Sequence, residues 1–88
     1  MASYAHEFRG HDIKIKNEIS KMSLIIDGET QDCRTGAYPS KTFTLQGQIL
    51  NGRDQGDEIK VEFKRGFLFS SLIFYYNDKQ IGKSTVLI

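Results

Sequence analysis

The chain has 88 residues, of which 39% are hydrophobic and 26% charged, the composition of an ordinary soluble globular protein. This length supports one modest hydrophobic core, so we expect a single domain over residues 1–88. Twelve Lys and Arg against eleven Asp and Glu give a net charge of +1, which excludes a strong positive field for binding nucleic acid or an anionic membrane.

The sequence shows no sign of membrane insertion or export. No apolar run approaches the roughly 20 residues of a membrane helix, and the polar N-terminus lacks a signal-peptide segment. Cys33 is the only cysteine, so an internal disulfide is excluded and a reducing compartment is favoured. We therefore expect a cytoplasmic protein.

Alternating apolar and polar residues predict three short strands near the N-terminus, at residues 4–9, 12–19 and 22–26, with Gly10 interrupting the first. One side of the first strand carries Tyr4, His6 and Phe8.

Asp27-Gly28 is the strongest hairpin signal in the chain, because this pair suits a type I′ turn. The turn would join residues 22–26 to a strand at 29–35. A two-residue turn sets Cys33 opposite Met22, on the inward face.

The middle of the chain contains two predicted loops and one strand. The loops are residues 36–40, with the only proline, and residues 51–57. Between them, Phe43, Leu45 and Ile49 mark a strand in which Gly47 takes an inward position and allows close packing or a bend.

Residues 58–81 contain four of the six phenylalanines, so the core must be built on them. Residues 58–64 alternate as a half-buried strand, and 64–66 suit a three-residue hairpin loop ending in a left-handed Gly66. The resulting register pairs Phe63 with Phe67 and Val61 with Phe69.

The next run changes phase at Ser70-Ser71. A β-bulge there would keep one set of large residues inward: Phe67, Phe69, Leu72, Phe74 and Tyr76. Strict alternation would instead expose one of two sets, either Phe67, Phe69, Ile73 and Tyr75 or Leu68, Leu72, Phe74 and Tyr76. We favour the bulge, because an exposed apolar face is the less common outcome.

Asn77-Asp78 tolerates the positive φ angles of a two-residue turn, which sets Phe74 opposite Ile81. No segment has helical periodicity. Seven to eight short strands joined by tight turns predict an all-β fold, an antiparallel β-sandwich or flattened barrel, whose strand order the sequence does not specify.

This order of signals resembles a repeat of the Fas apoptotic inhibitory molecule family over roughly residues 11 to 83. The matching motifs are His11-x-Ile13-x-Ile15, Asp27-Gly28, Phe43-x-Leu45-x-Gly47, Ile59-x-Val61, Gly66-Phe67 and Asn77-Asp78-Lys79, the last where the family tends to have Asn-Gly-Lys. The chain departs from the family in having one repeat instead of two and no Trp. The resemblance implies an antiparallel β-sandwich that binds other proteins and has no catalytic residues.

Gly82-Lys83-Ser84-Thr85 is similar to the end of a phosphate-binding loop. The full motif needs a glycine where Asn77 stands and a helix after the Lys-Ser pair. Neither condition is met, so we expect no phosphate site.

His6, His11 and Cys33 lack the spacing of a zinc site, and a nucleophilic Cys33 would need a polar cleft. We expect histidines at or near the surface and a packing role for Cys33. Asp54, Asp57 and Glu58 bring three carboxylates near one loop, but without calcium-loop spacing, so solvated charge is the default. The sequence thus predicts no catalytic residue, no metal site and no cofactor.

Two features are candidate interaction surfaces. One is Leu68, Ile73 and Tyr75, which the bulge would place outward. The other is the apolar edge at residues 85–88, including Val86 and Ile88, which could pair with a second copy or a partner's extended segment. Coverage of this edge within the monomer is the alternative.

We therefore expect a non-enzymatic protein-interaction module that binds a protein partner or forms a homodimer through a sheet edge or an outer sheet face, without binding nucleic acid or membrane. The alternative is a β-sandwich that binds a small ligand or carbohydrate through loops 36–40 and 51–57, with or without calcium.

Overall fold

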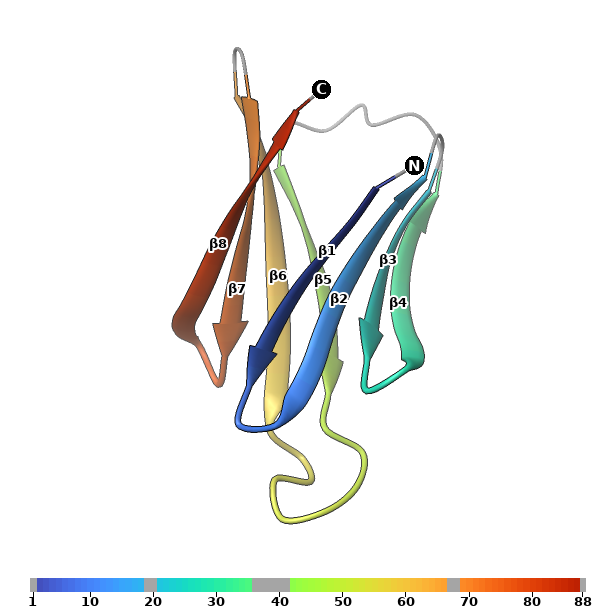
Figure 1. Cartoon of the computed structure of the whole chain (residues 1–88), viewed down its shortest axis with the longest axis vertical. Helices are drawn as coiled ribbons and strands as arrows, with labels where there is room; N and C mark the ends of the chain where they lie inside the picture. Colours follow the sequence, from blue (N-terminus) through green and yellow to red (C-terminus); the bar gives the residue numbers. More distant parts are fainter. Residues whose placement is uncertain (1, 19–20, 36–41, 67–68, 88) are drawn as a thin grey trace.

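The computed structural model describes residues 2–18, 21–35, 42–66 and 69–87. Within these ranges the chain forms eight antiparallel strands in two four-stranded sheets, in which each strand pairs with its sequence neighbours (Figure 1). The first sheet contains β1 (Ala2–Phe8), β2 (His11–Glu18), β3 (Lys21–Ile26) and β4 (Glu29–Thr35). The second contains β5 (Thr42–Gln48), β6 (Glu58–Arg65), β7 (Phe69–Tyr76) and β8 (Lys79–Leu87).

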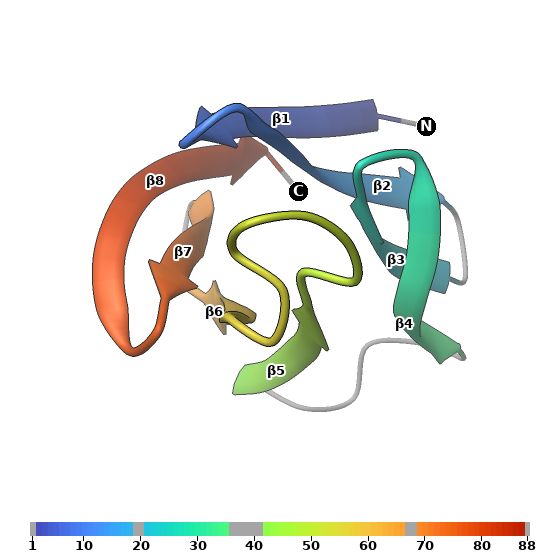
Figure 2. The same cartoon turned by 90° about the horizontal axis from the view of Figure 1, so that it is seen from below.

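The two sheets face each other, so the predicted all-β antiparallel sandwich is confirmed (Figure 2). Their inward side chains form one core, as period-two alternation requires. The buried members are Ile13, Ile15, Met22, Leu24, Ile26, Phe43, Leu45, Ile49, Ile59, Val61, Phe63, Leu72, Phe74 and Tyr76. No helix in the described ranges is long and apolar enough to cross a membrane.

Three two-residue turns and the loop at residues 49–57 lie together at one end of the sandwich, which we call the turn end (the lower end in Figure 1). Asp27 and Gly28 have φ angles of 50° and 83°, which confirms the predicted type I′ turn. Asn77 and Asp78, at 49° and 68°, confirm the second predicted turn. Arg9-Gly10 makes a third of the same kind.

Strands β4 and β8 each contain a bulge that the sequence did not predict. Leu24 pairs with Asp32 and Ile25 with Thr30, so Gln31 is the extra residue. Phe74 pairs with Gly82 and Tyr75 with Gln80, so the extra residue in β8 is Ile81. Both bulges follow a tight turn by three residues. A bulge increases local twist, which suits edge strands that must turn toward the opposite sheet.

These bulges overturn two predicted pairings. The extra residue at Gln31 reverses the phase of the rest of β4, so Cys33 lies opposite Ser23 and is exposed instead of packing against Met22. The bulge at Ile81 likewise replaces the expected partner of Phe74 with Gly82.

The predicted register of the central hairpin is also wrong. Phe63 pairs with Leu72 and Val61 with Phe74, in an unbroken ladder that ends at Arg65 and Ser70. The connection is therefore longer than the predicted three residues, and Gly66 has no positive φ. Phe67 lies outside the described residues.

The predicted bulge at Ser70-Ser71 does not form, because β6 and β7 pair continuously there. Strict alternation places Ser70 in the core and leaves Phe69, Ile73 and Tyr75 on the outer face. This is the outcome that we expected to be less favourable. A small serine at one core position accommodates it.

The edge of β5 is closed by side chains from β4. The Gln31 carboxamide donates to the Gln48 carbonyl (2.7 Å) and accepts from the Gln48 N–H (2.8 Å). The Asp32 carboxylate accepts from the Gln46 N–H (2.9 Å). A Cβ on Gly47 would lie 2.8 Å from the Gln31 Oε1, so the predicted close packing at this glycine is confirmed.

The edge of β8 is met in the same way by β1. His6 Nε2 lies 2.9 Å from the Ile81 carbonyl oxygen, and its ring stacks on Phe74 with centroids 5.5 Å apart. The imidazole occupies the space above Gly82, where any Cβ would overlap it. The two sheets thus meet along two seams, β4–β5 and β1–β8. At each seam a glycine of the second sheet, Gly47 or Gly82, leaves room for a polar side chain of the first sheet.

We expect Gly82→Ala to lower the free energy of unfolding by about 1–3 kcal/mol, the usual cost of overpacking. The backbone here needs no positive φ, so the cost reports the clash with His6. Chemical denaturation of the single and double variants measures it. In a His6→Ala background the same substitution should cost much less. Equal costs in both backgrounds would contradict this packing.

Candidate functional site

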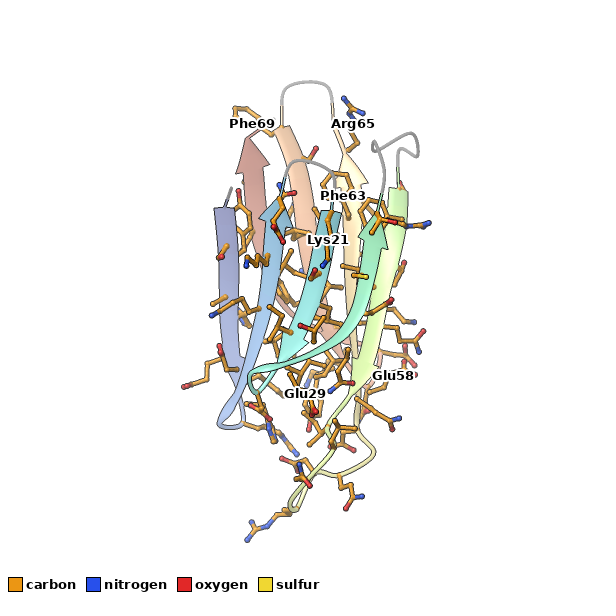
Figure 3. All side chains as sticks on the ribbon, turned by 90° about the vertical axis from the view of Figure 1, so that its right-hand side faces the viewer. Lys21, Glu29, Glu58, Phe63, Arg65 and Phe69 are labelled. Carbon is orange, nitrogen blue, oxygen red and sulfur yellow. The ribbon has the colours of Figure 1, made fainter. Side chains whose placement is uncertain are left out.

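Three of the four outward side chains of β7 are large and apolar: Phe69, Ile73 and Tyr75, which we call the outer stripe, with Ser71 between the first two. Phe69 is 51% exposed, and Tyr75 is partly exposed. Ile73 is 9% exposed although it is outside the core cluster, and it pairs with Glu62 on one side and Lys83 on the other. In Figure 3, Phe69 lies at the end of the sheet opposite to Glu58.

Charged residues flank the outer stripe. Lys60 contacts Asp78 at 3.3 Å, and Lys64 contacts Glu62 at 3.6 Å. A shallow depression beside Tyr75 is lined by Lys60, Glu62 and Asp78. The face therefore combines an aromatic and aliphatic centre with a charged border.

The predicted interaction residues are only partly brought together. Ile73 and Tyr75 share the outer stripe, two positions apart on β7. Leu68 and Ile88 lie outside the described residues. Val86, on β8, pairs with Ser70 on β7, but the Val86 side chain lies outside the described part. Phe69 was expected in the core, so its place in the outer stripe was missed.

The free edge of β8 is partly blocked. Its bulge at Ile81 interrupts regular pairing, and His6 already occupies the Ile81 carbonyl. Lys79 and Lys83 on this strand are exposed, and lysines on edge strands oppose pairing with another chain. Gly82-Lys83-Ser84-Thr85 lies within this strand.

The turn end holds a polar cluster in which charged groups from both sheets meet. His11 lies 2.8 Å from the Asp27 carboxylate and 3.0 Å from that of Asp54. Arg9 lies 3.6 Å from Asp54, and its guanidinium carbon is 5.8 Å from the centre of the Tyr76 ring.

Tyr76 anchors the same end from β7. Its hydroxyl donates to the Asp57 carboxylate at 2.7 Å. Hydrogen bonds from Tyr76 and then Asn77 lower the pKa of Asp57 below its usual value. Burial, followed by the hydrogen bond to Asp57, raises the pKa of Tyr76 to about 12.

The residues weighed for metal binding or nucleophilic catalysis do not converge. His6 lies at the β1–β8 seam, His11 at the turn end, and Cys33 is exposed on β4. Asp54 binds His11, Asp57 binds Tyr76, and Glu58 accepts from the Gln46 side chain at 2.7 Å. Across the described ranges, no group of three His, Cys, Asp or Glu residues could hold a metal ion.

A polar groove runs beside the β4–β5 seam. It has a volume of about 480 Å³ and is open to solvent. Amide and carboxylate side chains line it, together with two glycines: Gln31, Asp32, Gln46, Gly47, Gln48, Gly56 and Glu58. Loop 36–40, expected to contribute to a ligand site, lies outside the described residues.

Comparison with protein-family models, with curated proteins and with solved structures found no match. The resemblance to the Fas apoptotic inhibitory molecule family therefore stays a prediction from the motifs alone.

We expect Asp57→Asn to move the pKa of Tyr76 from about 12 toward the ordinary 10.0, without reaching it because the ring stays buried. The folded pKa is raised above the unfolded one, so this contribution to stability is lost as pH rises from 10 to 12. Titration of the Tyr76 Cζ resonance by NMR measures the shift. Asp78→Asn, in the neighbouring turn, is the control and should leave Tyr76 unchanged. An unchanged Tyr76 in Asp57→Asn would contradict the role of this hydrogen bond.

Proposed function

We propose that the chain is a non-catalytic interaction module that binds a protein partner on the outer face of its second sheet, at the outer stripe. The observation that carries this proposal is Phe69, a large aromatic side chain that is 51% exposed in the same row as Tyr75. Exposed aromatic residues on a rigid sheet are typical anchors of protein interfaces.

The surroundings of the outer stripe support a binding role. Lys60, Glu62 and Lys64 border it on β6, as a polar rim borders the centre of many interfaces. Ile73 is already nearly covered, so it would add little newly buried area, and the two aromatic side chains would contribute most of it.

The outer face is a better candidate than the edge of β8. Pairing along that edge would have to pass the bulge at Ile81 and the lysine at 83. The outer face needs no such rearrangement, because its side chains already point away from the core.

The described polar groups support a role without catalysis. Both ring nitrogens of His11 contact carboxylates, and His6 contacts a backbone carbonyl. In the described part of the chain, both histidines contact groups other than Cys33, so neither is held as a base for the Cys33 thiol. The family resemblance also implies a protein that binds other proteins.

The test is to replace both aromatic anchors, as Phe69→Ser with Tyr75→Ser. Each substitution should weaken partner binding by at least about tenfold, as expected for an interface anchor. Affinity capture followed by titration with the captured protein measures the loss. Sedimentation across a range of concentrations detects the case in which the partner is a second copy.

Leu50→Ser is the matched control, because among the described residues Leu50 is the other large apolar side chain that is strongly exposed, at 42%, and it lies outside the second sheet. It should leave binding unchanged. Equal binding by the double variant and wild type, with both folded, would overturn the proposal.

A second candidate function is the binding of a small polar ligand, such as a sugar, in the polar groove. Its volume falls within the range of about 300–1,000 Å³ for ligand sites. The lining amides and carboxylates are hydrogen-bonding groups that suit hydroxyls. We propose this site without calcium, because the three carboxylates considered for calcium, Asp54, Asp57 and Glu58, have separate partners.

For this candidate we expect a mono- or disaccharide to raise the melting temperature of the wild type but not that of Gln46→Leu. The substitution removes the side chain that bonds Glu58 in the groove and leaves the backbone N–H to Asp32. A thermal-shift panel measures the difference. No shift with any sugar, or equal shifts in both proteins, would exclude sugar binding at this groove.

A further inference from the structure

His11 links the two sheets at the turn end. Its side chain is 15% exposed and lies between two carboxylates that come from different sheets. Nδ1 contacts Asp27, in the β3–β4 turn, at 2.8 Å. Nε2 contacts Asp54, in the loop between β5 and β6, at 3.0 Å.

This geometry specifies the protonation state of the imidazole. A carboxylate only accepts hydrogen bonds, so each ring nitrogen must donate. A neutral imidazole carries one N–H and presents a lone pair at its other nitrogen. Both contacts are therefore favourable only for the imidazolium.

The two carboxylates are held to different degrees. Asp27 is fixed from two sides, since its Oδ1 accepts the Asp12 N–H at 2.9 Å and its own N–H binds the Asp12 carbonyl at 2.8 Å. The partners of the Asp54 carboxylate from outside the loop are His11, at 3.0 Å, and Arg9, at the longer distance of 3.6 Å. Loss of one imidazole proton should therefore release Asp54 and leave Asp27 bound.

We propose that His11 is a pH-operated clasp between the two sheets. As imidazolium it holds loop 49–57 against the first sheet, and as neutral imidazole it releases the Asp54 side of that loop. Gly56, in the same loop, lines the polar groove, so release also frees one wall of the groove.

The neighbouring charges set the pH range of the clasp. The hydrogen bonds that His11 donates to Asp27 and then to Asp54 raise the pKa of His11 above 6.5, and together with the negative charges they outweigh the opposing effect of burial. A raised folded pKa means that the clasp contributes fully below pH 6.5 and is lost as pH rises through the folded value. Arg9, Asp57 and Tyr76 face the same cluster: Arg9 contacts Asp54, and Tyr76 donates to Asp57.

The contact between His11 and Asp27 also has an acid limit. Burial raises its pKa, but hydrogen bonds from the Asp12 amide and His11 outweigh burial, and the pKa is lowered below 3.8. Its contribution is therefore present above pH 3.8 and is lost as pH falls through the lowered value.

The test combines two NMR measurements on the whole chain. The His11 ring resonances give its pKa, which should lie above 6.5. Hydrogen exchange of the loop amides, expressed as protection factors that correct for intrinsic base catalysis, reports opening. The informative amides bind within the loop: Gln55 to Gly52, Gly56 to Ile49 and Asp57 to Asp54.

We expect their protection to fall about tenfold, the factor for one lost charge-assisted hydrogen bond, with the midpoint at the His11 pKa. In His11→Gln, protection at pH 6 should already be at the lower level and should not change with pH. His6→Gln, which removes the other described histidine contact, should keep the transition.

Asp54→Asn is the second variant, because it changes an exposed loop and leaves the core intact. It should lower the His11 pKa and abolish the coupled change in protection. A His11 pKa at or below 6.5, or loop protection that stays constant through the His11 titration, would overturn the proposal. So would a transition that persists in folded His11→Gln.

Discussion

The backbone groups at the edges of the two sheets are the constraint on which this structure depends. Each sheet ends in two edge strands whose N–H and C=O groups need partners. The protein supplies them with side chains, so that Gln31 acts as a surrogate peptide group for Gln48 and His6 reaches the Ile81 carbonyl. Gly47 and Gly82 make room for these side chains. The sandwich is thus closed at both seams without a ninth strand.

Local chemistry made much of the fold predictable. Period-two alternation located the strands, and Asp27-Gly28 and Asn77-Asp78 located two of the tight turns. The bulges at Gln31 and Ile81 could not be predicted in this way. They depend on the curvature of an edge strand toward the other sheet, which no local sequence pattern encodes. One extra residue also exchanges the inward and outward positions of the rest of the strand.

The residues of the candidate sites also differ in whether the local sequence pattern could place them. Ile73 and Tyr75 could be placed outward, because they flank the inward Phe74 whether β7 contains a bulge at Ser70-Ser71 or is continuous. Phe69 could not, since its position depends on whether the strand is continuous. The His11 cluster could not be predicted, because Asp27 reaches His11 only through the pairing of β2 with β3, and Asp54, 43 residues away, only through the stacking of the sheets.

The order of the strands in each sheet has a consequence for how the chain folds. Every strand pairs with the strand before or after it, so each sheet is assembled from successive local hairpins. Such pairings require small loops to close, and loop closure is the entropic cost that slows most β-proteins. The long-range step is the docking of the two meanders. Folding should therefore be fast for an all-β protein, with the two halves acquiring structure largely independently before their faces meet.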